Sequence, residues 1–219
     1  MSVPTVPPAL ADVLAFWLGR SSDSDYGARK QFWFQSTPAL DREITGRFLE
    51  THERAATGAF AGAAHDPAGC LALILLHDQL PRNMFRATPR SFATDAQALA
   101  LAEQAVAARF DREYAPLHRT FFYLPFEHSE RLTDQDRAVA LFEALPAYEL
   151  RERAIQMVQR HREIIVRFGR FPHRNEILRR PSTAAEIAFL QEPDSSFTFP
   201  RREDGTPDAA AWHEAAPVK

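Results

Sequence analysis

The sequence predicts an all-α protein of about eight helices. Apolar residues recur at helical spacing along most of the 219 residues, and prolines or capping residues precede these stripes. No Asn-Gly or Asp-Gly turn lies between alternating apolar runs, so strand signals are nearly absent. Hydrophobic residues make up 45% of the chain and charged residues 25%. This composition indicates a folded protein with a core of its own, and it excludes a disordered chain or a disulfide scaffold.

The first four predicted helices each follow a proline or an N-capping residue. Their starts are Pro7-Pro8, Thr37-Pro38, Asp66-Pro67 and Thr94-Asp95. The first helix should end at Gly19 and the second near Gly58. The third helix is almost wholly apolar and should end at Pro81, whereas the fourth is rich in alanine.

The other four predicted helices occupy the second half of the chain. The fifth carries an apolar face that extends to His128, and Pro125 should bend or break it. The later starts are near Thr133, near Tyr148 for a helix running to Phe168, and at the capping box of Thr183 and Glu186. We expect a single helical domain over residues 1–199. Residues 200–219 are rich in Pro, Ala and charge without a period, which predicts a mobile tail.

The overall charge and the cysteine content exclude several classes of partner. Lys and Arg number 26 and Asp and Glu 29, so the net charge of −3 gives no reason to expect nucleic acid. The single cysteine, Cys70, is typical of a reducing compartment. The first residues lack a signal-peptide pattern, and the longest apolar run, Cys70–Leu76, is far shorter than a membrane span. We therefore expect a cytoplasmic protein with no membrane partner.

Asp78 is a charged residue in an apolar place. Its spacing from Leu71 and Leu75 puts it on the apolar face of the third helix. A carboxylate is costly to bury there unless it is paired, and Arg82 and Asn83 in the next turn are candidate partners. Asp78 either binds an arginine that locks the fold or faces a ligand, and the sequence leaves both interpretations open.

A second polar cluster follows Pro125. Glu127 and Glu130 are neighbours if the turn is helical, and His128 is in phase with the preceding apolar residues, so it should point inward. A lone inward histidine is more often a hydrogen-bonded core residue than a ligand. The two neighbouring carboxylates shift this balance toward a functional role.

A third cluster lies at the end of the seventh predicted helix. His161 follows the apolar series of Ala154 and Val158 and should also point toward the core. Residues 160–180 hold seven arginines and two glutamates, a formal charge of +5. Gly169 and Pro172 should end the helix and leave a polar turn of Arg170, His173, Arg174 and Asn175. Arginines at such a bend suit a carboxylate or phosphate group, or they pair internally with the acidic residues named above.

The motifs of several enzyme classes are missing. The sequence has no phosphate-binding loop, dinucleotide fingerprint, nucleophile elbow or His-Glu-x-x-His zinc motif. Glu127, His128 and His161 are suitable metal ligands by type but have no diagnostic spacing. Cys70 lies in an apolar run and is typical of a small buried hydrophobe rather than a nucleophile. We therefore predict no metal and no cofactor.

Three motifs resemble those of one bacterial family. They are Leu76–Asn83, Leu124–Glu130 and Arg167–Asn175, in that order along the chain. The family is domain of unknown function 924, which is grouped with tetratricopeptide-like helical folds, and the resemblance extends from Val13 to about Phe197. Leu80 stands where the family motif has Phe. The resemblance implies a compact bundle of antiparallel helices in helical hairpins without regular repeats, and it implies no activity or catalytic residue.

Two classes of function fit these residues. In the first, an enzyme, the catalytic residues Asp78, Glu127, His128 and His161 meet in a polar cavity and carry out hydrolase- or lyase-type acid–base chemistry. Its ligand is a small anionic metabolite, and the predicted ligand-binding residues are Arg82, Asn83, Tyr123, Arg170, His173, Arg174 and Asn175. In the second, a non-catalytic helical scaffold binds an acidic peptide or protein through the same arginines.

We favour the small-molecule hypothesis, because acids, bases and histidines are mixed near helix bends, whereas a peptide groove more often carries one sign of charge. Whether the protein is an enzyme stays open at this point. RNA binding by residues 160–180 is disfavoured, because the apolar positions of that helix turn part of it inward.

Overall fold

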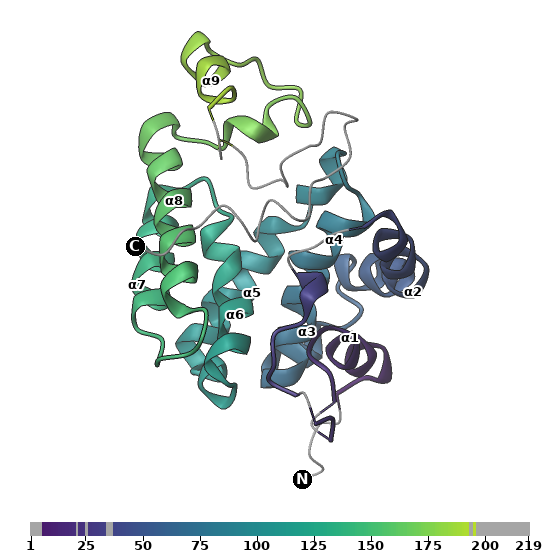
Figure 1. Cartoon of the computed structure of the whole chain (residues 1–219). Helices are drawn as coiled ribbons and strands as arrows, with labels where there is room; N and C mark the ends of the chain where they lie inside the picture. The colour runs from purple at the N-terminus through teal and green to yellow at the C-terminus, as the bar shows by residue number, and fades with distance from the viewer. Residues whose placement is uncertain (1–5, 21, 25, 34–36, 193–194, 196–219) are drawn as a thin grey trace. The chain divides into compact units, whose positions relative to one another are not determined.

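The structure, a computed structural model, describes residues 6–20, 22–24, 26–33, 37–192 and 195. Within these residues the chain forms nine α-helices and five short 3-10 helices and no strand, which confirms the all-α prediction (Figure 1). The chain divides into two compact units, Met1–Arg170 and Phe171–Lys219, and each is described by itself. None of the described helices is long and apolar enough to cross a membrane.

The first unit holds eight of the nine helices in the described residues. They are α1 (Pro8–Leu18), α2 (Pro38–Ala56), α3 (Pro67–His77), α4 (Gln79–Met84), α5 (Asp95–Ala108), α6 (Pro116–Glu127), α7 (Leu132–Glu143) and α8 (Arg151–Phe168). The 3-10 helices of this unit are Gln31–Trp33, Ala61–His65, Pro89–Phe92 and Phe110–Glu113.

Several helix starts follow directly from the local sequence. The Thr37 side chain accepts a hydrogen bond from the amide of Leu40, and Asp66 accepts two, from Ala68 and Gly69, so both residues cap their helices as predicted. The helix predicted near Thr133 is α7, which begins at Leu132; its N-cap is Arg131, and no side chain makes a cap hydrogen bond there.

Two predicted helix breaks also differ from the structure. Pro125 lies inside α6 and does not break it. It removes a single hydrogen bond, that to the carbonyl of Phe121, and the helix has only two more residues to form beyond it. The third predicted helix is divided at Asp78 into α3 and α4. This division turns about eight predicted helices into nine.

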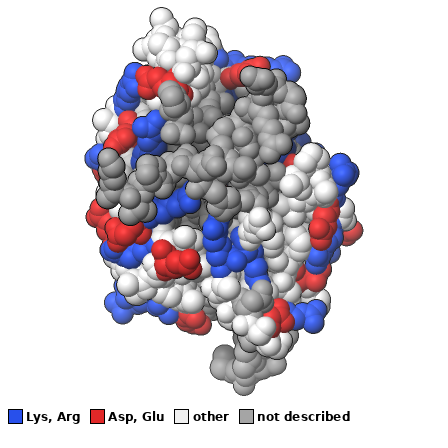
Figure 2. Space-filling model, in the orientation of Figure 1, with Lys and Arg blue, Asp and Glu red and all other residues white. Residues whose placement is uncertain are grey.

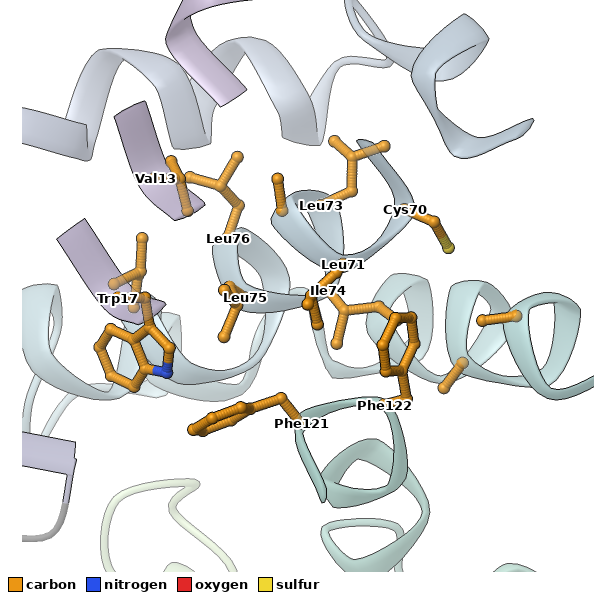
Figure 3. Packing of buried hydrophobic residues seen from close by; sticks show 14 of the residues in the cluster. Val13, Trp17, Cys70, Leu71, Leu73, Ile74, Leu75, Leu76, Phe121 and Phe122 are labelled. Atoms are coloured by element: carbon orange, nitrogen blue, oxygen red, sulfur yellow. The ribbon is translucent and has the colours of Figure 1, made fainter. Parts of the chain in front are cut away.

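Helix α3 lies at the centre of the first unit and contacts α1, α2, α4, α5 and α6. Every residue from Gly69 to His77 is buried, and Figure 3 shows Phe121 and Phe122 of α6 beside the α3 side chains. Burying a leucine or phenylalanine of this kind stabilises a fold by about 1.5–3 kcal/mol. The most apolar stretch of the sequence is therefore the element around which the other helices pack.

The helices α6, α7 and α8 pack side by side in chain order (Figure 1). The α6–α7 connection is only four residues long, from His128 to Arg131, so the two helices run antiparallel as a hairpin. On the face shown in Figure 2, cationic and anionic side chains alternate around the margin, as the small net charge suggests.

The second unit contains the 3-10 helix Pro172–Arg174 and α9 (Ala184–Phe189) among its described residues. Thr183 and Glu186 form the predicted capping box, in which each side chain bonds the other residue's backbone amide. A single domain over residues 1–199 stays a prediction. The tail predicted over residues 200–219 lies outside the described residues.

Candidate functional site

The candidate site begins at the junction between α3 and α4. Pro81 has no amide hydrogen, so the carbonyl of His77 has no donor four residues later, where a continuous helix would supply one. The hydroxyl of Thr94 donates to this carbonyl instead, at 2.7 Å. The helix therefore ends at His77, and Asp78 occupies the junction with only 1% of its surface exposed.

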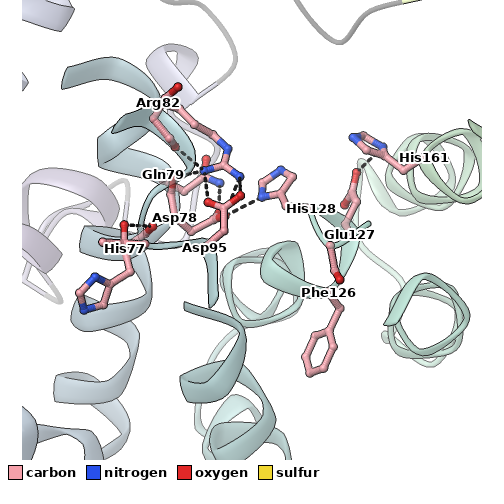
Figure 4. Close-up of polar contacts among 12 residues, drawn as sticks. His77, Asp78, Gln79, Arg82, Asp95, Phe126, Glu127, His128 and His161 are labelled. Atoms are coloured by element: carbon pink, nitrogen blue, oxygen red, sulfur yellow. Dashed lines mark hydrogen bonds and ion pairs between the residues drawn. The ribbon is translucent and has the colours of Figure 1, made fainter. Parts of the chain in front are cut away.

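The carboxylate of Asp78 is enclosed by donors (Figure 4). Its oxygens lie 2.6 Å from Nδ1 of His128, 3.1 Å from the guanidinium of Arg82 and 2.5 Å from the amide of Gln79. Burial alone would raise the pKa of Asp78, but Arg82, His128 and Gln79 together outweigh burial and hold the pKa well below its usual range. Asp78 is thus a buried carboxylate that stays ionised.

Arg82 links this junction to the start of α5. Its guanidinium forms a two-pronged ion pair with Asp95, at 3.0 and 3.3 Å, and donates to the backbone carbonyl of Asp78 at 2.6 Å. Two carboxylates thus share this one arginine, which holds Asp78 in place at the junction. The predicted role of Arg82 in binding a ligand stays a prediction.

His128 is the C-cap residue of α6 and directs its ring at Asp78. Burial lowers the pKa of His128; Asp78 opposes this effect and Arg82 adds to it, and the net shift is downward. The neutral ring places its proton on Nδ1, where the Asp78 oxygen accepts it, so the lone pair is on Nε2. An imidazole oriented in this way by a carboxylate is a base.

A second histidine–carboxylate pair lies next to the first. Nδ1 of His161 on α8 is 2.8 Å from Oε1 of Glu127 and 2.9 Å from the carbonyl oxygen of Met157. Since both neighbours are acceptors, Nδ1 carries the proton in this ring too. Glu127 and His161 are 3% and 5% exposed, and the rings of His128 and His161 lie 6.2 Å apart between centroids.

The end of α6 brings the two pairs together. Glu127 and His128 are consecutive residues, and adjacent side chains on a helix point in directions about 100° apart. Glu127 therefore reaches α8 on one side while His128 reaches the α3–α4 junction on the other (Figure 4). The four residues predicted as catalytic thus form two neighbouring acid–base pairs, in which Asp78, Glu127 and His161 are buried and His128 is partly exposed.

The structure places several other predicted residues elsewhere. The Asn83 amide donates to Asp41 at 2.8 Å, and the Tyr123 hydroxyl donates to Asp111 at 2.6 Å, so both side chains bond within the surrounding helices. Arg170 is the last residue of the first unit.

The predicted residues His173, Arg174 and Asn175 belong to the second unit. There the Arg174 guanidinium lies 4.5 Å from the centroid of the Phe171 ring, and Asn175 bonds Ser182 and Arg180. The predicted role of the polar turn in holding an anion stays a prediction.

Sequence reasoning missed three residues at this site, Gln79, Asp95 and Gln135. Asp95 was assigned only to a helix start, and Gln79 has no distinguishing pattern. Gln135 did leave a signal, because it is in phase with the buried Ala138 and Phe142 on α7. Among the described residues, no three His, Cys, Asp or Glu side chains are arranged to hold a metal ion.

This chain is similar in sequence to a known protein family and to a solved structure. A family model described as a bacterial protein of unknown function, DUF924, matches residues 13–194. The chain belongs to this family. A solved structure, that of the protein of unknown function ATU0120 from Agrobacterium tumefaciens, is 37% identical to this chain and superimposes with a TM-score of 0.72. The alignment covers 83% of this chain and 96% of that one. Comparison with curated proteins gave no match.

Two of the three motifs that indicated DUF924 meet at the site. Asp78 and Arg82 come from the first motif, and Glu127 and His128 come from the second. The bond between Asp78 and His128 joins them across 50 residues of sequence. In this DUF924 chain, polar residues of two family-like motifs thus converge in the first unit.

Proposed function

We propose that this protein binds a small molecule and performs acid–base chemistry on it, with His128 as the general base. The observation that supports this most strongly is the 2.6 Å contact between His128 Nδ1 and a buried, ionised Asp78. The carboxylate holds the ring in one tautomer and stabilises the imidazolium that forms when Nε2 takes a proton.

The second pair supplies a second oriented imidazole at short range. In a hydrolytic reaction, Nε2 of His128 removes a proton from water and then gives that proton to the leaving group, while Nε2 of His161, whose ring Glu127 orients, accepts a hydrogen bond from the water or the substrate. In an elimination, Nε2 of His128 removes a proton from the substrate and again passes it to the leaving group. A positioned general base typically contributes about 10²–10⁴-fold to a rate.

The class of ligand is proposed from the sequence rather than from the site. Arg170 and Arg174 suggest a small anion, and Arg82, the third predicted arginine, also pairs with Asp78 and Asp95. The alternative function, a helical scaffold for an acidic peptide, uses the same arginines but has no need for histidines in a fixed tautomer.

A thermal-shift screen tests the proposal. The wild-type protein and the variants His128→Gln and Arg174→Ala are melted with a panel of small phosphates, di- and tricarboxylates, and an acidic peptide. A compound at a hundredfold excess over its dissociation constant should stabilise the wild type by about 2.7 kcal/mol. We expect His128→Gln to abolish this shift, whereas Arg174→Ala tests by itself the anion-binding role predicted for the polar turn of the second unit.

The exposed His65 supplies the matched control, because His65→Gln changes a histidine away from the site. A small-molecule shift that His128→Gln leaves intact would contradict a role for this histidine. Stabilisation by the acidic peptide alone would support the scaffold.

A further inference from the structure

Gln135 of α7 joins its side-chain amide to the end of α6. The residue is fully buried, and its Nε2 lies 2.6 Å from the carbonyl oxygen of Glu127 and 2.6 Å from that of Ser129. A third carbonyl, that of Phe126, is 3.4 Å away. One side chain thus contacts the backbone on both sides of His128.

The surrounding acceptors fix the orientation of this amide. Carbonyl oxygens accept and never donate hydrogen bonds, so the end of the Gln135 side chain that faces them is the NH₂ group. Its two hydrogens serve the two nearer carbonyls. The carbonyls in the last turn of a helix lack donors within the helix, and Gln135 supplies donors from the next helix of the hairpin.

The Oε1 atom of Gln135 is buried and makes no hydrogen bond to any described residue. An unpaired buried acceptor reduces stability, whereas the NH₂ group of the same amide satisfies two carbonyls of the turn. What the amide contributes is therefore the conformation of the turn that it bonds.

One member of each acid–base pair, Glu127 or His128, lies in this turn, so the backbone of the turn sets the position of both side chains. The amide of His128 donates to the carbonyl of Leu124 at 2.8 Å, and the amide of Ser129 donates to that of Phe126 at 3.2 Å. Together with the two Gln135 bonds, these contacts give each of three successive peptide groups, from Glu127 to Glu130, at least one hydrogen bond. Fixed peptide planes fix the direction of the Cα–Cβ bonds of Glu127 and His128.

We propose that Gln135 is a positioning residue for both histidine–carboxylate pairs. It acts through the backbone of the α6–α7 turn and touches neither imidazole. Its importance for catalysis rests on the proposed function, but its effect on the two rings is measurable without any ligand or activity.

The experiment compares Gln135→Met with wild type by long-range ¹H–¹⁵N spectra of the histidine rings. Methionine has a similar length and no donor, so only the hydrogen bonds to the turn are lost. In the wild type, His128 and His161 should both show the Nδ1–H tautomer. In Gln135→Met, we expect loss of this tautomer signature in both rings, with Nδ1–H exchange at least about tenfold faster.

Gln104→Met is the matched control. Gln104 of α5 also donates to a backbone carbonyl outside its helix, that of Ala64 at 2.7 Å, and it lies outside the α6–α7 hairpin. Gln104→Met should leave both rings unchanged. If Gln135→Met does not fold, Gln135→Asn keeps the amide but shortens its reach, and it should alter the same two signals.

Unchanged tautomers and exchange rates in a folded Gln135 variant would overturn the positioning role. The ligand screen is a separate test. A thermal shift that His128→Gln leaves unchanged would contradict the proposed function, but it would not affect the conclusion drawn from the histidine spectra of the Gln135 variants.

Discussion

Acidification from about pH 7 to about pH 4 should weaken the fold through buried histidines, and His77 allows the size of the effect to be worked out. His77 lies at the end of α3 with 3% of its surface exposed, and its ring centroid is 6.3 Å from that of His52. Its Nδ1 is buried without a hydrogen-bond partner among the described residues. Burial, together with His52, lowers the pKa of His77 from 6.5 to about 4.

The sign of the effect follows from where the proton binds. In the unfolded chain this ring takes up a proton near pH 6.5, whereas in the folded chain it stays neutral until the pH falls to about 4. The contribution of the neutral ring is complete above pH 6.5 and is lost as the pH falls. At about 1.4 kcal/mol for each pH unit, the loss at pH 4 is about 3 kcal/mol in the free energy of unfolding.

Asp78 affects stability in a lower pH range than His77 does. Its lowered pKa means that its stabilisation is retained until the pH falls below 3.8, the ordinary value for an aspartate. Measurements between about pH 7 and pH 4 therefore isolate the histidines. Burial also lowers the pKa of His52 and His118, so the total acid loss should exceed that of His77 alone.

The assay is urea denaturation followed by circular dichroism at a series of pH values. His77→Leu should reduce the difference in unfolding free energy between pH 7 and pH 4 by about 3 kcal/mol. The exposed control His65→Leu should leave this difference unchanged. A pH profile of His77→Leu that superimposes on that of the wild type would refute the reasoning.

Three further substitutions should change stability in ways that urea denaturation can measure. Asp78→Asn removes a buried charge from an ion-pair network and should cost about 3 kcal/mol; a change below 1 kcal/mol would contradict that network. Gly69→Ala would place a Cβ 2.3 Å from the carbonyl oxygen of Ala63 and should cost about 1–3 kcal/mol, whereas Gly62→Ala, which meets no atom within 4 Å, should be tolerated. Thr183→Ala should cost about 1 kcal/mol if α9 depends on its capping box.

Helix starts were predictable because they depend on residues close together in sequence. The caps at Thr37, Asp66 and Thr183 each use a side chain that bonds an amide two or three residues later. The break at Asp78 was not predictable, since it depends on the hydroxyl of Thr94, which lies 17 residues from the carbonyl that it serves. Local sequence can indicate a missing donor but not the distant group that replaces it.

The candidate site was predictable in part for a similar reason. Helical phase indicated that Asp78, His128 and His161 point inward, and all three have partners in the interior. Helical phase does not determine which of several inward-pointing side chains will form a hydrogen bond or ion pair with one another. Asn83 and Tyr123 were therefore grouped with the site, although each reaches a different aspartate.

The adjacency of Glu127 and His128 has a mechanical consequence. If the last turn of α6 rotated about its axis, it would carry both side chains by the same angle, and each would leave its partner on a different neighbouring helix. The Asp78–His128 and Glu127–His161 contacts should therefore break together rather than one at a time. Any group that holds this turn in place stabilises both contacts.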